Sequence, residues 1–161
     1  MTKKETAFNE LINFHPPAVK DWLIEMDKLL MDSGCKAAVD SKGNFTYTAK
    51  QTKKIICRIT IKETGCLIRP NTSNVTSANS IAPKLPENML NIMRSTRGCG
   101  GCEKKNPNFI QCSHGGPYRL TYENEDFESC RYVGFNFEIE DASNRNVLKK
   151  WIELELLLEA A

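Results

Sequence analysis

The fold is decided by residues 55–69, which read IICRITIKETGCLIR. Apolar and polar side chains alternate in two runs that are separated by Glu63-Thr64. A period of two with β-branched residues is typical of strands, and two residues are enough for a tight turn. The sequence therefore predicts an antiparallel hairpin in which Arg58 lies opposite Arg69.

A third strand precedes this hairpin, because Phe45, Tyr47 and Ala49 alternate with polar residues. Patterns of apolar spacing predict further elements on both sides of this meander. They are an opening helix at 6–14, a helix from Pro17 to about Gly34, a short helix after Pro86, a hairpin of 118–122 with 127–139, and a last helix capped by Ser143 that buries Val147, Leu148, Trp151, Leu154 and Leu158. Residues 71–84, rich in Asn, Ser and Thr, are expected to form an exposed loop. We therefore expect one α+β domain over 1–161, in which helices pack on one face of an antiparallel sheet made of a three-strand meander plus a C-terminal hairpin.

The composition is that of a soluble globular protein, with 40% apolar and 26% charged residues. No apolar leader core follows the N-terminus and no stretch is apolar enough to span a bilayer, so we expect a cytoplasmic protein without a membrane partner. A net charge of +2 is too small to predict the concentrated basic face that nucleic acids require.

Cysteines in the second half of the chain form a pattern that suits a metal: Cys99, Cys102, Cys112 and Cys130. Zinc prefers four tetrahedral sulfur and nitrogen ligands, and a Cys-x-x-Cys bend supplies two of them. The glycines around Cys99 and Cys102 can adopt positive φ and turn backbone N–H groups toward the sulfurs. We predict a structural zinc site within residues 97–130, with His114 as an alternative fourth ligand.

Two other interpretations of these thiols stay open. Cys99 and Cys102 have the spacing of a thiol-disulfide pair, although such a motif normally follows a strand and opens a helix, and a helix is expected before this one. The four thiols are otherwise ordinary reduced cysteines. Cys35, Cys57 and Cys66 are predicted to fill the core, since the hairpin register separates the last two by about 13 Å, too far for a disulfide.

The predicted register also places two arginines side by side on the face of the sheet opposite the core. Arg58 faces Arg69, and burying Phe45 and Tyr47 on the core side brings Asn44 beside Arg58. Guanidinium groups bind carboxylates and phosphates through paired hydrogen bonds, so this face is a candidate site for a small anionic ligand. The alternative is that both arginines extend into water as ordinary surface residues.

No catalytic constellation stands out in the sequence. The histidines are His15 and His114, and there is no phosphate-binding loop, dinucleotide fingerprint, nucleophile elbow or His-Glu-x-x-His helix. We therefore predict a non-enzymatic, zinc-stabilised binding or regulatory module whose partner is a small anion or another protein. The alternatives are a thiol-disulfide or metal-dependent enzyme using Cys99 and Cys102, and a weak nucleic-acid-binding domain using Arg58, Arg69 and the lysines near 50–54.

The cysteine loop is followed by Cys130-Arg131-Tyr132, then by Phe135-x-Phe137 and a helix with Leu148-Lys149-Lys150-Trp151. In this arrangement the chain resembles a group of small, uncharacterised cytoplasmic proteins common in Firmicutes. Those proteins begin with a helix and a three-strand meander and carry cysteines before a Cys-Arg-Tyr strand, although their cysteine spacing differs from that of this chain. The opening is similar, more loosely, to bacterial α+β domains of the YdhG or YjbR type. The resemblance implies a bacterial α+β protein and no established activity.

Overall fold

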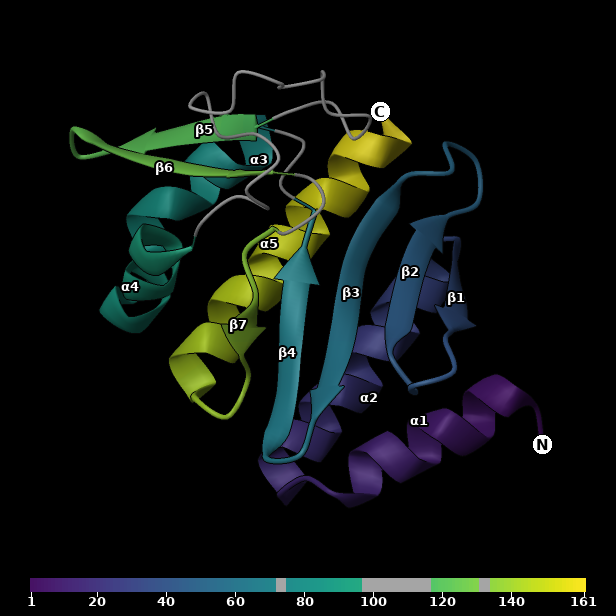
Figure 1. The fold of residues 1–161 in the computed structure, drawn as a ribbon. Coiled ribbons are helices and arrows are strands. Elements are labelled where there is room, and N and C mark those ends of the chain that lie inside the picture. The colour runs from purple at the N-terminus through teal and green to yellow at the C-terminus, as the bar shows by residue number, and fades with distance from the viewer. Residues whose placement is uncertain (72–74, 97–116, 131–133) are drawn as a thin grey trace, which may run out of the picture.

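The computed structural model describes residues 1–71, 75–96, 117–130 and 134–161 (Figure 1). Within these ranges the largest element is an antiparallel sheet in the strand order β1-β2-β3-β4-β7. Its strands are β1 (Cys35–Val39), β2 (Phe45–Ala49), β3 (Ile55–Lys62), β4 (Gly65–Pro70) and β7 (Phe137–Glu138). The predicted α+β class with an antiparallel sheet is confirmed.

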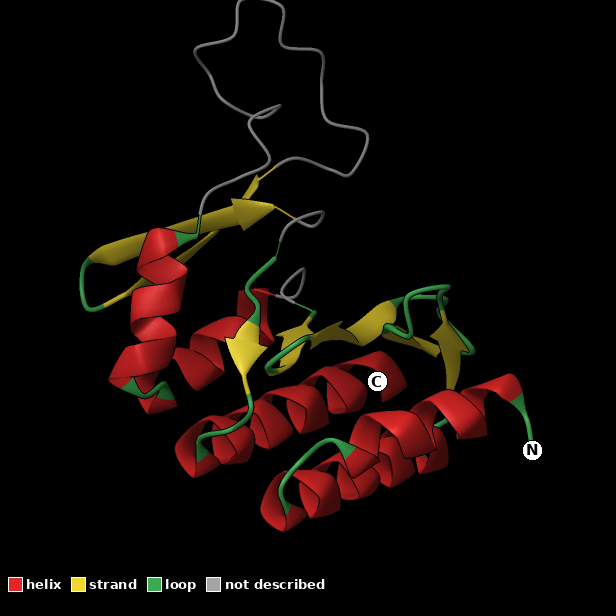
Figure 2. Ribbon diagram, turned by 60° about the horizontal axis from the view of Figure 1, so that its bottom comes forward, coloured by secondary structure: helices red, strands yellow, loops and turns green. Residues whose placement is uncertain are grey.

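Three helices lie on the same side of this sheet, and the other side carries none of the described helices (Figure 2). They are α1 (Lys3–Asn13), α2 (Pro17–Asp32) and α5 (Ala142–Ala160). A second group of elements lies beside the edge formed by β4 and β7 (Figure 1). It consists of α3 (Val75–Ile81), a 3-10 turn (Ala82–Lys84), α4 (Glu87–Ser95) and the hairpin of β5 (Pro117–Tyr122) with β6 (Glu125–Cys130). None of the described helices is both long and apolar enough to cross a bilayer.

The hairpin of β3 and β4 has the predicted register. Glu63-Thr64 forms the turn, and Arg58 pairs with Arg69 across the two strands. On the opposite face of the sheet Cys57 and Cys66 are buried as free thiols, as predicted. The tight turn fixes the register, and the register decides which side chains face the helices and which face away from them.

The core lies between the sheet and the helices α2 and α5. Buried apolar side chains include Val19, Trp22, Leu23, Met26 and Leu30 of α2 and Val147, Leu148, Trp151 and Ile152 of α5, which face Phe45, Tyr47, Ile59, Ile68 and Phe137 of the sheet. Each such side chain contributes about 1.5–3 kcal/mol of burial free energy. Trp22 also donates its Nε1–H to the carbonyl of Arg145 at 3.2 Å, which ties α2 to α5.

Two segments near the strands differ from the sequence prediction. The expected exposed loop 71–84 contains α3 and the 3-10 turn, and its residues Ser77, Ala78 and Ile81 are buried. The small side chains of Ser77 and Ala78 let α3 pack closely against α5. The meander has four strands and not three, because β1 pairs with β2. The sequence pattern did not predict β1, since Val39 is the only β-branched residue in this strand.

The expected continuous strand 127–139 is also wrong. β6 ends at Cys130, and β7 pairs with β4 so that Phe137 lies opposite Ile68. The chain therefore leaves the small hairpin and joins the large sheet. Phe137 is fully buried and its ring centroid lies 6.0 Å from that of Trp151, so burial of one aromatic side chain explains the change of sheet.

The last helix differs from the prediction in its N-cap and in the last residues of its buried face. Its N-cap is Asp141 and not Ser143, because the Asp141 carboxylate accepts the Ser143 N–H at 2.7 Å. Leu158 is 38% exposed, whereas Glu155 is fully buried. A carboxyl group thus lies where the sequence pattern predicts only apolar side chains.

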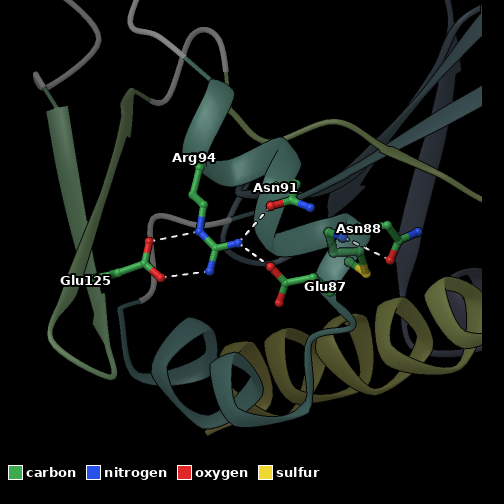
Figure 3. A network of polar contacts seen from close by, with 6 residues as sticks. Glu87, Asn88, Asn91, Arg94 and Glu125 are labelled. Atoms are coloured by element: carbon green, nitrogen blue, oxygen red, sulfur yellow. Dashed lines mark hydrogen bonds and ion pairs between the residues drawn. The ribbon is translucent and has the colours of Figure 1, made fainter.

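An exposed polar network connects the hairpin to α4 (Figure 3). Arg94 of α4 donates two hydrogen bonds to the carboxylate of Glu125 on β6, at 2.9 and 2.7 Å. The same guanidinium donates to Glu87 at 2.5 Å and to Asn91 at 2.7 Å. Because the Glu125 carboxylate accepts from Arg94, the pKa of Glu125 is lowered from its usual value. The network holds two elements of the second group together.

Candidate anion-binding face

The open face of the sheet is the side that α1, α2 and α5 leave uncovered (Figure 2). Successive side chains of a strand point to opposite faces, and Tyr47, Ile59 and Ile68 point toward the helices. The side chains between them therefore lie on the open face. They include Thr46 and Thr48 of β2, Arg58 and Thr60 of β3, and Leu67 and Arg69 of β4, all of which are half-buried.

Arg58 lies at the centre of this face. Its backbone pairs with Thr46 on one side and with Arg69 on the other. The side chain is half-buried, its Nε–H is buried, and within the described residues neither this N–H nor the rest of the guanidinium has a hydrogen-bond partner or an ion pair. A partly desolvated cation beside another cation is unfavourable unless an anion compensates its charge.

Arg69 reaches the open face by crossing the backbone of Gly134. A Cβ atom at Gly134 would collide with Cδ and Cγ of Arg69, and the φ of this glycine is +62°. Glycine is therefore required here for two reasons, because the conformation is left-handed and because the arginine stem occupies the space. The position of the second guanidinium depends on this close approach.

Asn44 was expected beside Arg58, but Thr46 occupies that position, because Phe45 pairs with Ile59 and not with Cys57. The Asn44 amide instead closes the turn between β1 and β2. It donates to the Asp40 carboxylate at 2.9 Å and accepts the Ile61 N–H at 2.9 Å. We therefore assign Asn44 to the turn, and we take Thr46 as the polar neighbour of Arg58.

The chemistry of this face suits a small anion better than a nucleic acid. Two guanidinium groups and the hydroxyl groups of Thr46 and Thr60 are hydrogen-bond donors on one surface. The described strand positions on the open face carry no aromatic side chain. Single-stranded nucleic acids are normally held by stacking on aromatic side chains, so a base-stacking platform is absent from these strands.

The predicted metal ligands lie almost entirely outside the described residues. This holds for Cys99, Cys102, Cys112 and His114, and for the side chain of Cys130. The backbone of Cys130 is described, and it pairs with Pro117 at the end of the hairpin. Among the described residues no group of three or more His, Cys, Asp or Glu side chains has the arrangement of a metal site.

The three cysteines whose side chains are described are unsuited to redox work. Cys35, Cys57 and Cys66 are buried, and burial raises the pKa of each thiol. For Cys66 the pKa rises to about 12, mainly because of burial and to a smaller extent because of the Glu140 carboxylate. A thiol with so high a pKa is protonated and unreactive at neutral pH.

Sequence reasoning missed one titratable group inside the fold. Glu155 of α5 is fully buried and accepts a short hydrogen bond from the Ser77 hydroxyl of α3. Burial raises its pKa to about 7, with the Glu159 carboxylate adding to the rise and Ser77 and Lys54 opposing it. The sequence does contain an indication of this burial, because Glu155 lies on the same helix face as the buried residues Leu148 and Trp151. A lone acid and a serine do not form a catalytic set, so we treat this pair as part of the fold.

No family model, curated protein or solved structure matches this chain. The resemblance to the Firmicutes proteins therefore stays a prediction, and the function has to be argued from the site.

Proposed function

We propose that this protein is a non-enzymatic binding module whose open sheet face holds an anionic group between Arg58 and Arg69. The observation that carries the proposal is the half-buried guanidinium of Arg58, which has no partner among the described residues and lies directly across the strand pair from Arg69. A fully exposed arginine would extend into water at little cost. A half-buried one loses part of its hydration, and a bound anion would restore the missing hydrogen bonds.

A phosphate group fits this face best. The guanidinium of Arg58 presents its N–H groups as a planar fork, and phosphate offers more oxygens to such a fork and to neighbouring donors than a carboxylate does. The Thr46 and Thr60 hydroxyls flank Arg58 and add donors of the kind that often contact phosphate. A carboxylate has only two oxygens and would leave part of the donor set unused.

The test is a titration of the protein with inorganic phosphate at low salt, followed by backbone NMR shifts. We expect shifts that centre on β3 and β4 and that shrink as the ionic strength rises. Arg58→Met removes the charge and the fork, and we expect it to weaken phosphate binding by at least about tenfold. Arg58→Lys keeps the charge without the planar fork, so its phosphate affinity should lie between those of Arg58→Met and the original chain.

The matched control is Arg94→Met, which removes an arginine whose partners are all in the protein. This variant should bind phosphate as the original chain does. Equal phosphate affinity in Arg58→Met and in the original chain would reject the proposal, and so would shifts that appear only outside the sheet.

We also propose that the module is stabilised by structural zinc bound to Cys99, Cys102, Cys112 and Cys130. The pairing of Pro117 with Cys130 supports this, because the segment that carries the other three cysteines rejoins the described fold at Pro117. A reducing cytoplasmic location would keep these thiols available for the metal.

Metal analysis of protein purified without added zinc should find about one equivalent. Cys130→Ser should lower that content, whereas Cys35→Ala, which alters a buried core thiol, should not. Less than about a tenth of an equivalent in the original chain would exclude the zinc site.

A further inference from the structure

A cleft lies at the end of the sheet where the turns are. It has a volume of about 590 Å³ and opens between the end of α1, the turn after β1 and the turn between β3 and β4. Pockets of roughly 300–1,000 Å³ are typical of sites for small molecules. The cleft is separate from the pair of arginines, because it lies on the side of the sheet toward α1.

One wall of the cleft is apolar and open to solvent. Phe14, directly after α1, is 86% exposed, and Ile61 of β3 is 37% exposed. Ile61 lies against Gly43, where a Cβ atom would come within 3.3 Å of its Cδ1 and where φ is +85°. A side chain at Gly43 would be strained by this positive φ and would crowd Ile61, so glycine suits this wall.

The other side of the cleft carries one oriented charge. The Glu140 carboxylate accepts the N–H of Ile139 at 3.1 Å and lies across Gly65, where a Cβ atom would collide with it. The other charged side chains that line the cleft are Glu10, Lys42, Lys62 and Glu63, and none of them makes a side-chain hydrogen bond or ion pair within the described ranges. The lysines can move away from an incoming cation, whereas Glu140 is held in position.

We propose that this cleft binds a small molecule in which a protonated amine is attached to an apolar body. The apolar body would lie against Phe14 and Ile61, and the ammonium group would reach the oriented Glu140 carboxylate. An oriented charge loses little conformational freedom on binding, so it favours its complement more than a free side chain does. The face of an exposed phenyl ring also attracts a cation, which adds to the same preference.

Three ligands of nearly equal shape test the charge preference: 2-phenylethylamine, 2-phenylethanol and 3-phenylpropanoate. Affinities are measured by NMR titration at about pH 7. We expect the amine to bind at least about tenfold more tightly than the carboxylate, with the alcohol between them. The shifts should centre on Phe14, Ile61 and Gly65.

Two variants separate the contribution of the Glu140 carboxylate to ligand binding from that of the Phe14 ring. Glu140→Gln keeps an acceptor for the Ile139 N–H and should remove the preference for the amine while leaving alcohol binding unchanged. Phe14→Ala removes an exposed side chain, so it should leave stability unchanged and weaken the amine and the alcohol alike. Glu25→Gln, on the outer side of α2, is the matched control and should change none of the affinities.

The proposal is wrong if the three ligands bind equally, if the carboxylate binds best, or if the amine does not bind at about 10 mM. It is also wrong if a capped Phe-Lys peptide binds and the free amine does not, because the occupant would then be a protein segment. None of these results bears on phosphate binding at Arg58, so the two proposals stand or fall separately.

Discussion

Arg94 and Arg58 have the same side chain in opposite surroundings. Arg94 is on the surface and donates to two carboxylates and an amide, so its hydrogen bonds link α4 to the hairpin (Figure 3). Arg58 is half-buried on the open sheet face, has another arginine opposite, and has no partner within the described residues. The more exposed guanidinium is the one whose hydrogen-bonding groups are better satisfied.

Arg94 is thus a charge that stabilises the fold, whereas the guanidinium of Arg58 remains available to bind a ligand. Satisfied charges such as Arg94 contribute a little to stability and can be replaced at modest cost. An unpartnered, partly buried charge lowers stability, and a chain retains it only where another role compensates. Mutations at charged and adjoining positions test whether this rule holds throughout the molecule.

The largest expected effect concerns the fully buried carboxyl group of Glu155. Its pKa is raised from 4.5 to about 7 by burial, so between these pH values the folded protein holds a proton that the unfolded chain has lost. The free energy of unfolding should therefore fall as the pH rises from about 4.5 to 7, by on the order of 3 kcal/mol, and level off above.

The variant Glu155→Gln cannot ionise and should lose this dependence on pH. Chemical denaturation at pH 8 should show it to be more stable than the original chain, by up to on the order of 3 kcal/mol, with little difference near pH 4.5. Glu10→Gln, which alters an exposed carboxylate of α1, is the control and should follow the original chain. Equal stability of Glu155→Gln and the original chain at pH 8 would contradict the expected cost of this buried charge.

The next largest effect is expected from a mutation that displaces Arg69, the residue opposite Arg58. Gly134→Ala places a methyl group where the Arg69 stem now lies, in a left-handed backbone conformation. We expect a loss of about 1–2 kcal/mol in the free energy of unfolding, and weaker phosphate binding because Arg69 must move. Denaturation and the phosphate titration measure the two effects. A stable variant with unchanged phosphate affinity would show that the position of Arg69 does not depend on Gly134.

A smaller effect, a gain in stability, is expected when the charge of Arg58 is removed. Arg58→Met keeps a long side chain but removes the charge that faces Arg69, so without phosphate the variant should be more stable by about 0.5–1 kcal/mol. Saturating phosphate should reverse the order, because only the original chain gains binding energy. Thermal unfolding with and without phosphate is the measurement, and destabilisation in both conditions would indicate that Arg58 has a structural partner.

The smallest effect is expected at the satisfied arginine. Arg94→Gln should lower the melting temperature by about 1–3 °C, and 1 M salt should reduce the difference. Because Arg94 lowers the pKa of Glu125, this contribution is present above the usual Glu pKa and is lost as the pH falls through the lowered value. A difference that persists at 1 M salt would show that the network acts through packing and not through charge.

The sequence was sufficient to predict the centre of the sheet and the pair of arginines. Alternation in β3 and β4 and a two-residue turn determine a register without reference to distant residues. The segments that were missed depend on tertiary contacts. Cys35–Val39 is a strand because α2 and β2 adjoin it, and Val75–Ile81 is a helix whose small residues gain stability only against α5.

Of the candidate sites, the sequence predicted the one that a local pattern encodes. Arg58 and Arg69 follow from the hairpin register, but Asn44 was misplaced because the register of the preceding pair was inferred from burial alone. The cleft joins Phe14, Gly43 and Glu140, which lie far apart in the chain, and no periodic pattern connects them. The buried carboxyl of Glu155 was not predicted, because its burial depends on the contact with Ser77 of α3.

The edge of β4 is completed only by β7, a two-residue strand that emerges from the ribosome long after β4 itself. Until Phe137 and then α5 have been synthesised, the β4 edge of the nascent sheet is open, and the part of its apolar face that α5 covers is exposed. Open edges pair readily with other strands, so a growing chain that lacks β7 and α5 should be prone to aggregate. Translation stalled before Phe137 would accordingly yield aggregates and not a smaller folded protein.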